Sequence, residues 1–278
     1  MRITVWVSIC LVAATVLVAS CAGGDNVTRL GPGSSPAWSP DGSRIAFVSP
    51  VGVCLMEAGG GNPTVLVPGA LRCPAWSPDG DRIAFLAQNS IMTIGTNGRS
   101  PACVVISSSL WQLSERVSWS PDGRRIAFST TDDGEWHICL VNVDGTDKTM
   151  LGAGGADDSN PAWAPDGKRI AFDSQRDGHS EIYIMDADGG NVTRLTDNTC
   201  TDMYPSWSPD GGRIAFISSR DGKWEVYMMN ADGSNVAVLT QNDLTELALD
   251  WSPDGSRIAF SGQTKGGDWE MYAVDVPA

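Results

Sequence analysis

The chain has 278 residues, of which 42% are hydrophobic and 19% are charged, so it can build a packed core and lacks the composition of a disordered polymer. Its 33 acidic and 19 basic residues give a formal net charge of -14, which argues against a nucleic-acid partner and against adhesion to an anionic membrane by charge. Two histidines exclude a multi-histidine metal site, and 31 glycines and 16 prolines favour turns and short strands over long helices.

Residues 1–20 have the layout of a secretory signal peptide. Arg2 is their only charged residue, and an apolar stretch follows it. The stretch closes with Leu-Val-Ala-Ser-Cys at residues 17–21, which resembles the lipobox of bacterial lipoproteins. This resemblance implies that Cys21 carries a lipid and that residues 21–24 form a flexible tether. Ordinary cleavage nearby and an uncleaved anchor are the alternatives.

From residue 25 onward, one unit is repeated six times. The string Pro-Ala-Trp-Ser-Pro-Asp-Gly-Ser-Arg-Ile-Ala-Phe of residues 36–47 returns in five near-copies, and each phenylalanine of the chain closes one copy. The tryptophans of the six copies are Trp38, Trp76, Trp119, Trp163, Trp207 and Trp251. Such regular spacing indicates six copies of one structural unit.

Each unit is expected to contain four short strands. Pro-Ala-Trp is the first, Ser-Pro-Asp-Gly is a type I turn, and Arg-Ile-Ala-Phe is the second strand. Residues 181–185 and 225–229 exemplify the third strand, and residues 192–195 and 236–239 the fourth. Four antiparallel strands in about 44 residues are typical of a propeller blade, which can bury both of its faces only between neighbouring blades.

The two ends of the repeat predict how the ring closes. The sixth unit stops after its third strand, near Val276, whereas Asn-Val-Thr-Arg-Leu at residues 26–30 is identical to the fourth strand at residues 191–195. We therefore expect an all-β, six-bladed β-propeller of residues 25–278 in which the N-terminal strand completes the sixth blade. Such pairing would leave no open sheet edge at the closure.

The patterns PAWSPDGxRIAF and IYxMDADGxNVTRLT resemble the propeller repeats of the TolB family, over nearly all of the chain after the signal. TolB itself is a periplasmic protein with an α/β domain ahead of its propeller, and the resemblance implies a propeller without that domain here. Together with the lipobox, it implies a protein anchored through Cys21 to the cell membrane or outer membrane, facing the periplasm or the cell exterior.

The links between blades vary in sequence and lead into the innermost strands, so we expect them around the mouth of the central channel. The candidate ligand- or partner-binding residues at this mouth are Trp111, Glu115, Asp157, Asp158, Asn160, Asp202, Tyr204, Glu246 and Asp250. Carboxylates there would attract a basic peptide or a cation such as Ca²⁺, and the aromatic rings could anchor a partner. The alternative is a solvated acidic rim with packed aromatic residues.

The sequence offers no catalytic machinery. It has no GxSxG elbow and no HExxH motif, and neither His137 nor His179 has a convincing catalytic companion. We therefore predict no catalytic residues, no cofactor and no metal ligands. The leading hypothesis is a non-enzymatic, lipid-anchored module that binds an envelope protein or peptide. The alternatives are a sugar- or Ca²⁺-binding propeller, or a hydrolase or lyase with its site at the channel mouth.

Overall fold

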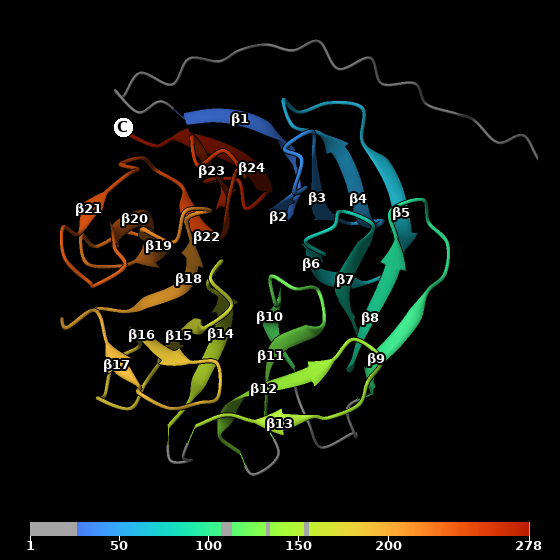
Figure 1. Cartoon of the computed structure of the whole chain (residues 1–278). Helices are drawn as coiled ribbons and strands as arrows, with labels where there is room; N and C mark the ends of the chain where they lie inside the picture. The colour runs from blue at the N-terminus through green and yellow to red at the C-terminus, as the bar shows by residue number, and fades with distance from the viewer. Residues whose placement is uncertain (1–26, 107–112, 132–133, 153–155, 278) are drawn as a thin grey trace, which may run out of the picture.

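The strands form six four-stranded antiparallel sheets in a computed structural model that describes residues 27–106, 113–131, 134–152 and 156–277. Figure 1 shows the sheets arranged as blades around a centre, with the first strand of each blade innermost. The predicted all-β, six-bladed propeller with four antiparallel strands per blade is confirmed. Within the described ranges, no helix is long and apolar enough to cross a membrane.

The first three blades succeed one another along the chain. Blade one consists of β2 (Ser34–Trp38), β3 (Arg44–Ser49), β4 (Gly52–Glu57) and β5 (Thr64–Pro68). Blade two consists of β6 (Leu71–Trp76), β7 (Arg82–Ala87), β8 (Ser90–Gly95) and β9 (Ala102–Ile106). Blade three consists of β10 (Leu113–Trp119), β11 (Arg125–Thr131), β12 (Trp136–Asn142) and β13 (Thr149–Met150).

The last three blades repeat this order, except that the outer strand of blade six comes from the other end of the chain. Blade four consists of β14 (Asp158–Trp163), β15 (Arg169–Ser174), β16 (Glu181–Asp186) and β17 (Thr193–Arg194). Blade five consists of β18 (Asp202–Trp207), β19 (Arg213–Ser218), β20 (Glu225–Asn230) and β21 (Ala237–Val238). Blade six consists of β22 (Thr245–Trp251), β23 (Arg257–Gln263), β24 (Trp269–Asp275) and β1 (Val27–Pro32).

The closure by the N-terminal strand is confirmed. β1 pairs antiparallel with β24, and the Arg29 guanidinium donates two hydrogen bonds to the Glu270 carboxylate, of 2.7 and 2.6 Å. Next along the chain, the Ser35 amide donates a 2.8 Å hydrogen bond to the Ser261 hydroxyl of blade six. The ring therefore closes through both backbone pairing and side-chain contacts.

The outer strands of blades four and five are shorter than predicted, with two residues each instead of four. A side-chain hydroxyl takes the place of a backbone carbonyl in the hydrogen bonding between the third and fourth strands. The Leu195 amide still donates to the Ile182 carbonyl, but the Thr196 hydroxyl then accepts the Ile182 N–H at 2.9 Å. Because a hydroxyl replaces the backbone carbonyl, the chain leaves the sheet at this point. Thr240 does the same at Val226 in blade five.

The Ser-Pro-Asp-Gly segments form the predicted turns, held by a network around the aspartate. In blade one, the Gly42 amide donates to the Ser39 carbonyl, and Gly42 has a φ of 71°, which glycine adopts without strain. Asp41 accepts hydrogen bonds from the Ser39 hydroxyl and the Ser43 amide, and these bonds lower its pKa to about 2. These turns thus carry carboxylates that are committed to local structure.

The motif tryptophans hold neighbouring blades together. Each is 5 to 9% exposed, and the motif arginine of the preceding blade covers the ring in five of the seams. The arginine–tryptophan pairs are Arg44–Trp76, Arg125–Trp163, Arg169–Trp207, Arg213–Trp251 and Arg257–Trp38, with the guanidinium carbon 4.8 to 5.4 Å from the ring centre. Burial of the indole and the cation–π contact stabilise the same seam.

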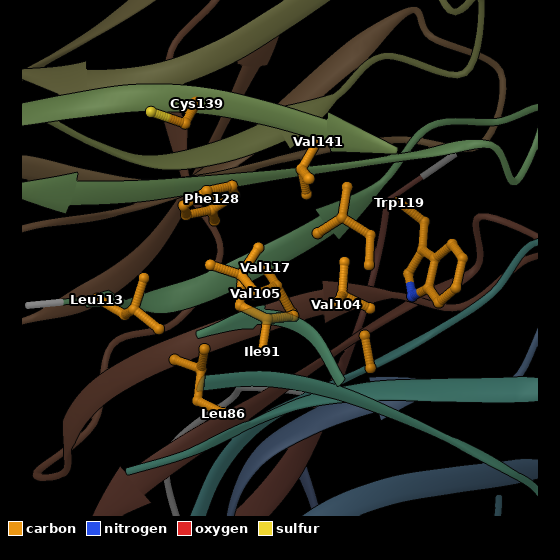
Figure 2. Close-up of a cluster of buried hydrophobic side chains, with 12 residues drawn as sticks. Leu86, Ile91, Val104, Val105, Leu113, Val117, Trp119, Phe128, Cys139 and Val141 are labelled. Atoms are coloured by element: carbon orange, nitrogen blue, oxygen red, sulfur yellow. The ribbon is translucent and has the colours of Figure 1, made fainter. Parts of the chain in front are cut away.

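Apolar side chains fill the space between the blades. At the seam of blades two and three, Leu86, Ile91 and Val105 face Val117 and Phe128 (Figure 2). Cys139 belongs to the same cluster and pairs in register with Phe128, so it serves as a core residue. None of the five described cysteines forms a disulfide. Each blade therefore depends on its neighbours for its hydrophobic core.

Trp207→Ala tests this dependence. We expect it to lower the free energy of unfolding by about 3–5 kcal/mol, because it leaves a cavity at the seam of blades four and five and removes the ring beneath Arg169. Urea unfolding followed by circular dichroism measures the change. Val236→Ala, at a 39% exposed side chain of blade five, is the control. A loss below 1 kcal/mol in Trp207→Ala would contradict the seam packing.

Candidate functional site

A cavity of about 550 Å³ occupies the centre of the ring. The innermost strands β2, β6, β10 and β22 form most of its wall, and Tyr204 of β18 contributes from blade five. The wall combines aromatic rings, serine hydroxyls, arginines and a carboxylate. Its volume lies within the range of roughly 300–1,000 Å³ in which small-molecule pockets fall.

Every innermost strand contains a β-bulge that places a variable residue in the ring. Pairing with the second strand shifts in register shortly before the motif tryptophan in all six blades. We call the residues three positions before the tryptophans the bulge ring: Ser35, Cys73, Arg116, Asn160, Tyr204 and Ala248. All of these except Asn160 line the cavity. The bulges thus place six different residue types at equivalent positions of the inner strands.

Five members of the bulge ring have a left-handed backbone. Their φ values lie between 47° and 58°, at Ser35, Cys73, Asn160, Tyr204 and Ala248. Each such conformation costs a non-glycine residue on the order of 1–2 kcal/mol. The fold retains this strain at the wall of the cavity, where it sets the direction of the variable residues.

One arginine and two aspartates bring charge to the centre. The Arg116 guanidinium donates a 2.8 Å hydrogen bond to the Pro205 carbonyl across the ring. Burial lowers the pKa of Arg116, whereas the negative charges of Asp250 and Asp173 act to raise it. Asp250 accepts a 2.8 Å hydrogen bond from the Trp38 amide, which joins blade six to blade one. Burial raises the Asp250 pKa to about 6, although the hydrogen bond from the Trp38 N–H and the charge of Arg116 both act to lower it.

Asp173 likewise joins two blades, four and five, through hydrogen bonds. Its carboxylate accepts hydrogen bonds from the Ser159 hydroxyl at 2.8 Å, the Asn160 amide at 3.0 Å and the Tyr204 backbone N–H at 3.1 Å. Burial nevertheless raises its pKa to about 6. Asp173 therefore fixes two members of the bulge ring, one through its side chain and one through its backbone.

The residues expected at the channel mouth divide into several groups. Tyr204 and Asp250 line the cavity, whereas Asn160 is 8% exposed and bonded to Asp173. Trp111 and the Glu115 side chain lie outside the described residues. These placements bring three of the nine expected residues to the cavity or beside it.

The remaining carboxylates are bound within the blades and do not form an open acidic rim. Asp157 accepts the Trp136 amide at 3.0 Å, and Arg176 donates two 2.9 Å hydrogen bonds to Asp158. Asp202 and Glu246 are fully buried. Among the described residues, no group of three or more histidine, cysteine, aspartate or glutamate side chains could hold a metal ion.

The family model of the TolB beta propeller domain matches residues 52–198 and 104–277 of this chain. The chain belongs to the TolB beta-propeller family. No curated protein matches it in sequence. A structure assigned as TolB from Agrobacterium tumefaciens is 24% identical, with a TM-score of 0.72 over 91% of this chain and 97% of that one.

Other solved structures share the fold of this TolB-family propeller at lower identity. TolB from Acinetobacter baumannii is 21% identical with a TM-score of 0.66, covering 88% of this chain and 64% of that one. A gluconolactonase from Xanthomonas campestris is 15% identical with a TM-score of 0.68, covering 91% of this chain and 88% of that one. The fold is thus shared by proteins with different functions.

Among the bulge-ring residues that line the cavity of this TolB-family propeller, sequence reasoning missed four: Ser35, Cys73, Arg116 and Ala248. The variation at one position of the repeat could have revealed them. The tryptophan and the turn after it hardly change between repeats, but the third residue before each tryptophan differs in every one. A position that varies inside an otherwise repeated strand is the place to look for a ligand-contacting residue.

Substitutions of Asp250 test its role at the closing seam. Asp250→Ala should lower the free energy of unfolding by about 1–3 kcal/mol, because the Trp38 N–H loses its acceptor. Asp250→Asn keeps an acceptor oxygen and should cost less. Since the folded pKa is about 6 and the ordinary value is 3.8, protonated Asp250 adds stability that disappears as pH rises from about 4 through 6.

Asp250→Asn should therefore show a smaller loss of stability across this pH interval than the wild type does. Urea denaturation at a series of pH values measures both effects. Equal stability of the alanine and asparagine variants at pH 7 would argue against the hydrogen bond to Trp38.

Proposed function

We propose that this TolB-family propeller is a non-enzymatic binding module that holds an extended peptide segment of an envelope protein in its central cavity. The observation that carries the proposal is the bulge ring, which projects different residue types from a uniform scaffold toward one cavity of about 550 Å³. A volume of this size accommodates a few peptide residues.

The chemistry of the wall supports a peptide. Tyr204 and Trp269 offer rings for apolar side chains, while Ser34 and Ser118 offer hydroxyls. Within the described ranges, no further strand pairs with the inner edge of a blade. Side chains such as Asp250, Asp173 and Arg116 already bind some of the backbone groups there, which leaves the others for an extended chain. Arg116 adds a cation to a wall that also carries a carboxylate, which favours a ligand with both charged and apolar groups.

The use of the two central aspartates supports binding over catalysis. Asp173 and Asp250 accept backbone N–H groups of neighbouring blades, so they are committed to holding the ring together. A general acid or base must instead be free to exchange its proton with a substrate. We therefore propose that the chain is not an enzyme.

A peptide-display experiment on the full chain tests the proposal. Random linear peptides selected on the wild type should lose at least tenfold in affinity for Ala248→Trp, whose indole would fill part of the cavity beside β22. Val65→Trp places the same side chain at a 52% exposed position of the outer strand β5 and should bind as the wild type does. Fluorescence anisotropy of labelled peptides measures both.

The outcomes separate the hypotheses. No enrichment of peptides over a control protein of similar charge would overturn the proposal, and peptides that bind Ala248→Trp normally would place binding outside the cavity.

Aromatic rings beside polar groups also suit a sugar, which makes an oligosaccharide the second candidate. A ligand that binds only the folded chain must raise its melting temperature, so thermal shifts with oligosaccharides examine this alternative.

We also propose that Cys21 anchors the module to the bacterial envelope through a lipid, as its place at the end of an apolar segment suggests. Cys21→Ser should abolish incorporation of a labelled fatty acid in a bacterial host and release the propeller from the membrane fraction. Cys103→Ser, at an exposed strand position, is the matched control and should leave labelling unchanged. Labelling that persists in Cys21→Ser would exclude this tether.

A further inference from the structure

The bulge ring contains a single charged residue, Arg116 of blade three. The equivalent positions of the other five blades hold serine, cysteine, asparagine, tyrosine and alanine. Because all six positions are equivalent in the repeat, a blade does not need a cation there in order to form. The charge of Arg116 is therefore a property of this cavity and not of the propeller scaffold.

The Arg116 side chain crosses the ring from blade three to blade five. Its backbone belongs to β10, and its Nη1 donates the 2.8 Å hydrogen bond to the Pro205 carbonyl of β18. Blade four lies between these two blades (Figure 1). Among the described residues, none of blade four lines the cavity, whereas every other blade contributes to its wall. Arg116 therefore bounds the cavity on the side of blade four.

One edge of the guanidinium has no hydrogen bond within the protein. Among the described residues, the Nε and Nη2 atoms of Arg116 have no acceptor, since only Nη1 donates to Pro205. Neither atom is sealed from solvent, and the side chain lines the cavity. The N–H groups of Nε and Nη2 point in parallel along one edge, and such an edge matches the two oxygens of a carboxylate.

Two carboxylates attract Arg116 without binding it. The charges of Asp250 and Asp173 favour the charged guanidinium, but neither of these two described aspartates forms an ion pair or a hydrogen bond with it. Asp250 accepts the Trp38 N–H instead, and Asp173 accepts hydrogen bonds within blades four and five. The aspartates thus help the folded chain to bury the cation, while its Nε and Nη2 groups stay available.

The wall of the cavity has an excess of positive charge although the chain as a whole is acidic. Among the described residues that line it, the cationic ones are Arg72 and Arg116, and the acidic one is Asp250. The formal net charge of the chain is -14, so a ligand with many negative charges is repelled at long range. A ligand that suits this cavity combines one anionic group with neutral or basic parts.

We propose that Arg116 binds a carboxylate of the peptide that occupies the central cavity, through its Nε and Nη2 groups. This inference rests on the proposed function, because it names the chemical group by which the peptide is held. The C-terminal carboxylate and the side chain of an aspartate or a glutamate offer the same two oxygens. Arg116 is thus the residue that determines which peptides the cavity accepts.

A carboxylate suits the free edge better than the other acceptors of a peptide do. A backbone carbonyl is neutral, and Pro205 already supplies one to Nη1. A carboxylate accepts both N–H groups of the edge and places a negative charge in direct contact with a cation that burial has partly stripped of water. It therefore provides the one interaction that neither Asp250 nor Asp173 makes with Arg116.

Peptides with and without their carboxylates test the proposal on the full chain. Peptides are selected on the wild type from a library with free C-termini. Each is then synthesised as the free acid, as the C-terminal amide, and with its aspartates and glutamates replaced by asparagine and glutamine. At least one of the two altered forms should bind the wild type at least about tenfold more weakly than the free acid. Fluorescence anisotropy measures the affinities, and the form that loses affinity identifies the carboxylate.

Arg116→Gln separates recognition of the ligand from support of the ring. This variant should bind the free acid and the altered forms with equal affinity, whereas loss of a mere brace between blades three and five would weaken all forms by the same factor. Arg116→Lys keeps the charge without the planar fork and should retain part of the difference. Arg99→Gln removes an exposed arginine of the hairpin between β8 and β9, and as the matched control it should discriminate as the wild type does.

The outcomes distinguish this inference from the proposed function. A wild type that binds all forms of its selected peptides equally would overturn the inference and leave the proposed function in place. A difference that persists undiminished in Arg116→Gln would overturn it as well. Failure to enrich any peptide would overturn the proposed function and this inference with it. The comparison of peptide forms on the wild type decides the matter even if Arg116→Gln fails to fold.

Discussion

The contact between each motif tryptophan and the neighbouring blade is the interaction on which the ring depends. A single blade exposes apolar side chains on both faces, and four strands of two to seven residues cannot bury them. The tryptophan of each blade is buried at the seam, and in five of the seams the arginine of the blade before it lies over the ring, so these seams combine buried apolar area with a cation–π contact. The last such pair, Arg257 over Trp38, joins residues more than 200 positions apart and makes a circle from a linear repeat.

Additional contacts hold the ring closed between blades six and one. Asp250 accepts the Trp38 N–H, Ser261 accepts the Ser35 N–H, and β1 completes blade six through its pairing with β24. Seams between consecutive blades are held at short range by the chain itself, whereas the seam between blades six and one must bring distant segments together against a larger loss of chain entropy. Side-chain hydrogen bonds at the level of the cavity and strand pairing at the rim oppose that loss.

The repeat made most of the fold predictable, and the reason is that each repeated residue has a local task. Proline and glycine determine the turn, and the identity of residues 26–30 with 191–195 revealed the closing strand. The β-bulges were not predictable, because a bulge depends on the pairing register of two strands and leaves no fixed residue type. Carboxylates such as Asp158 in the links suggested an exposed rim, since the arginine that binds Asp158 stands 18 positions later and meets it only in the folded blade.

Acidic side chains are buried at equivalent positions of two neighbouring seams. One full repeat apart, Glu181 and Asp202 contact Arg194 and Arg220, whereas Glu225 and Glu246 both contact the Thr240 hydroxyl. Because arginine keeps its charge at all relevant pH values, opposite charges hold the first of these seams together. Glu246 is followed directly by Leu247 and Ala248, which line the central cavity. The strand β22 therefore carries a buried carboxyl group of the seam next to residues that form the cavity wall, so the packing of blades five and six fixes the position of that wall.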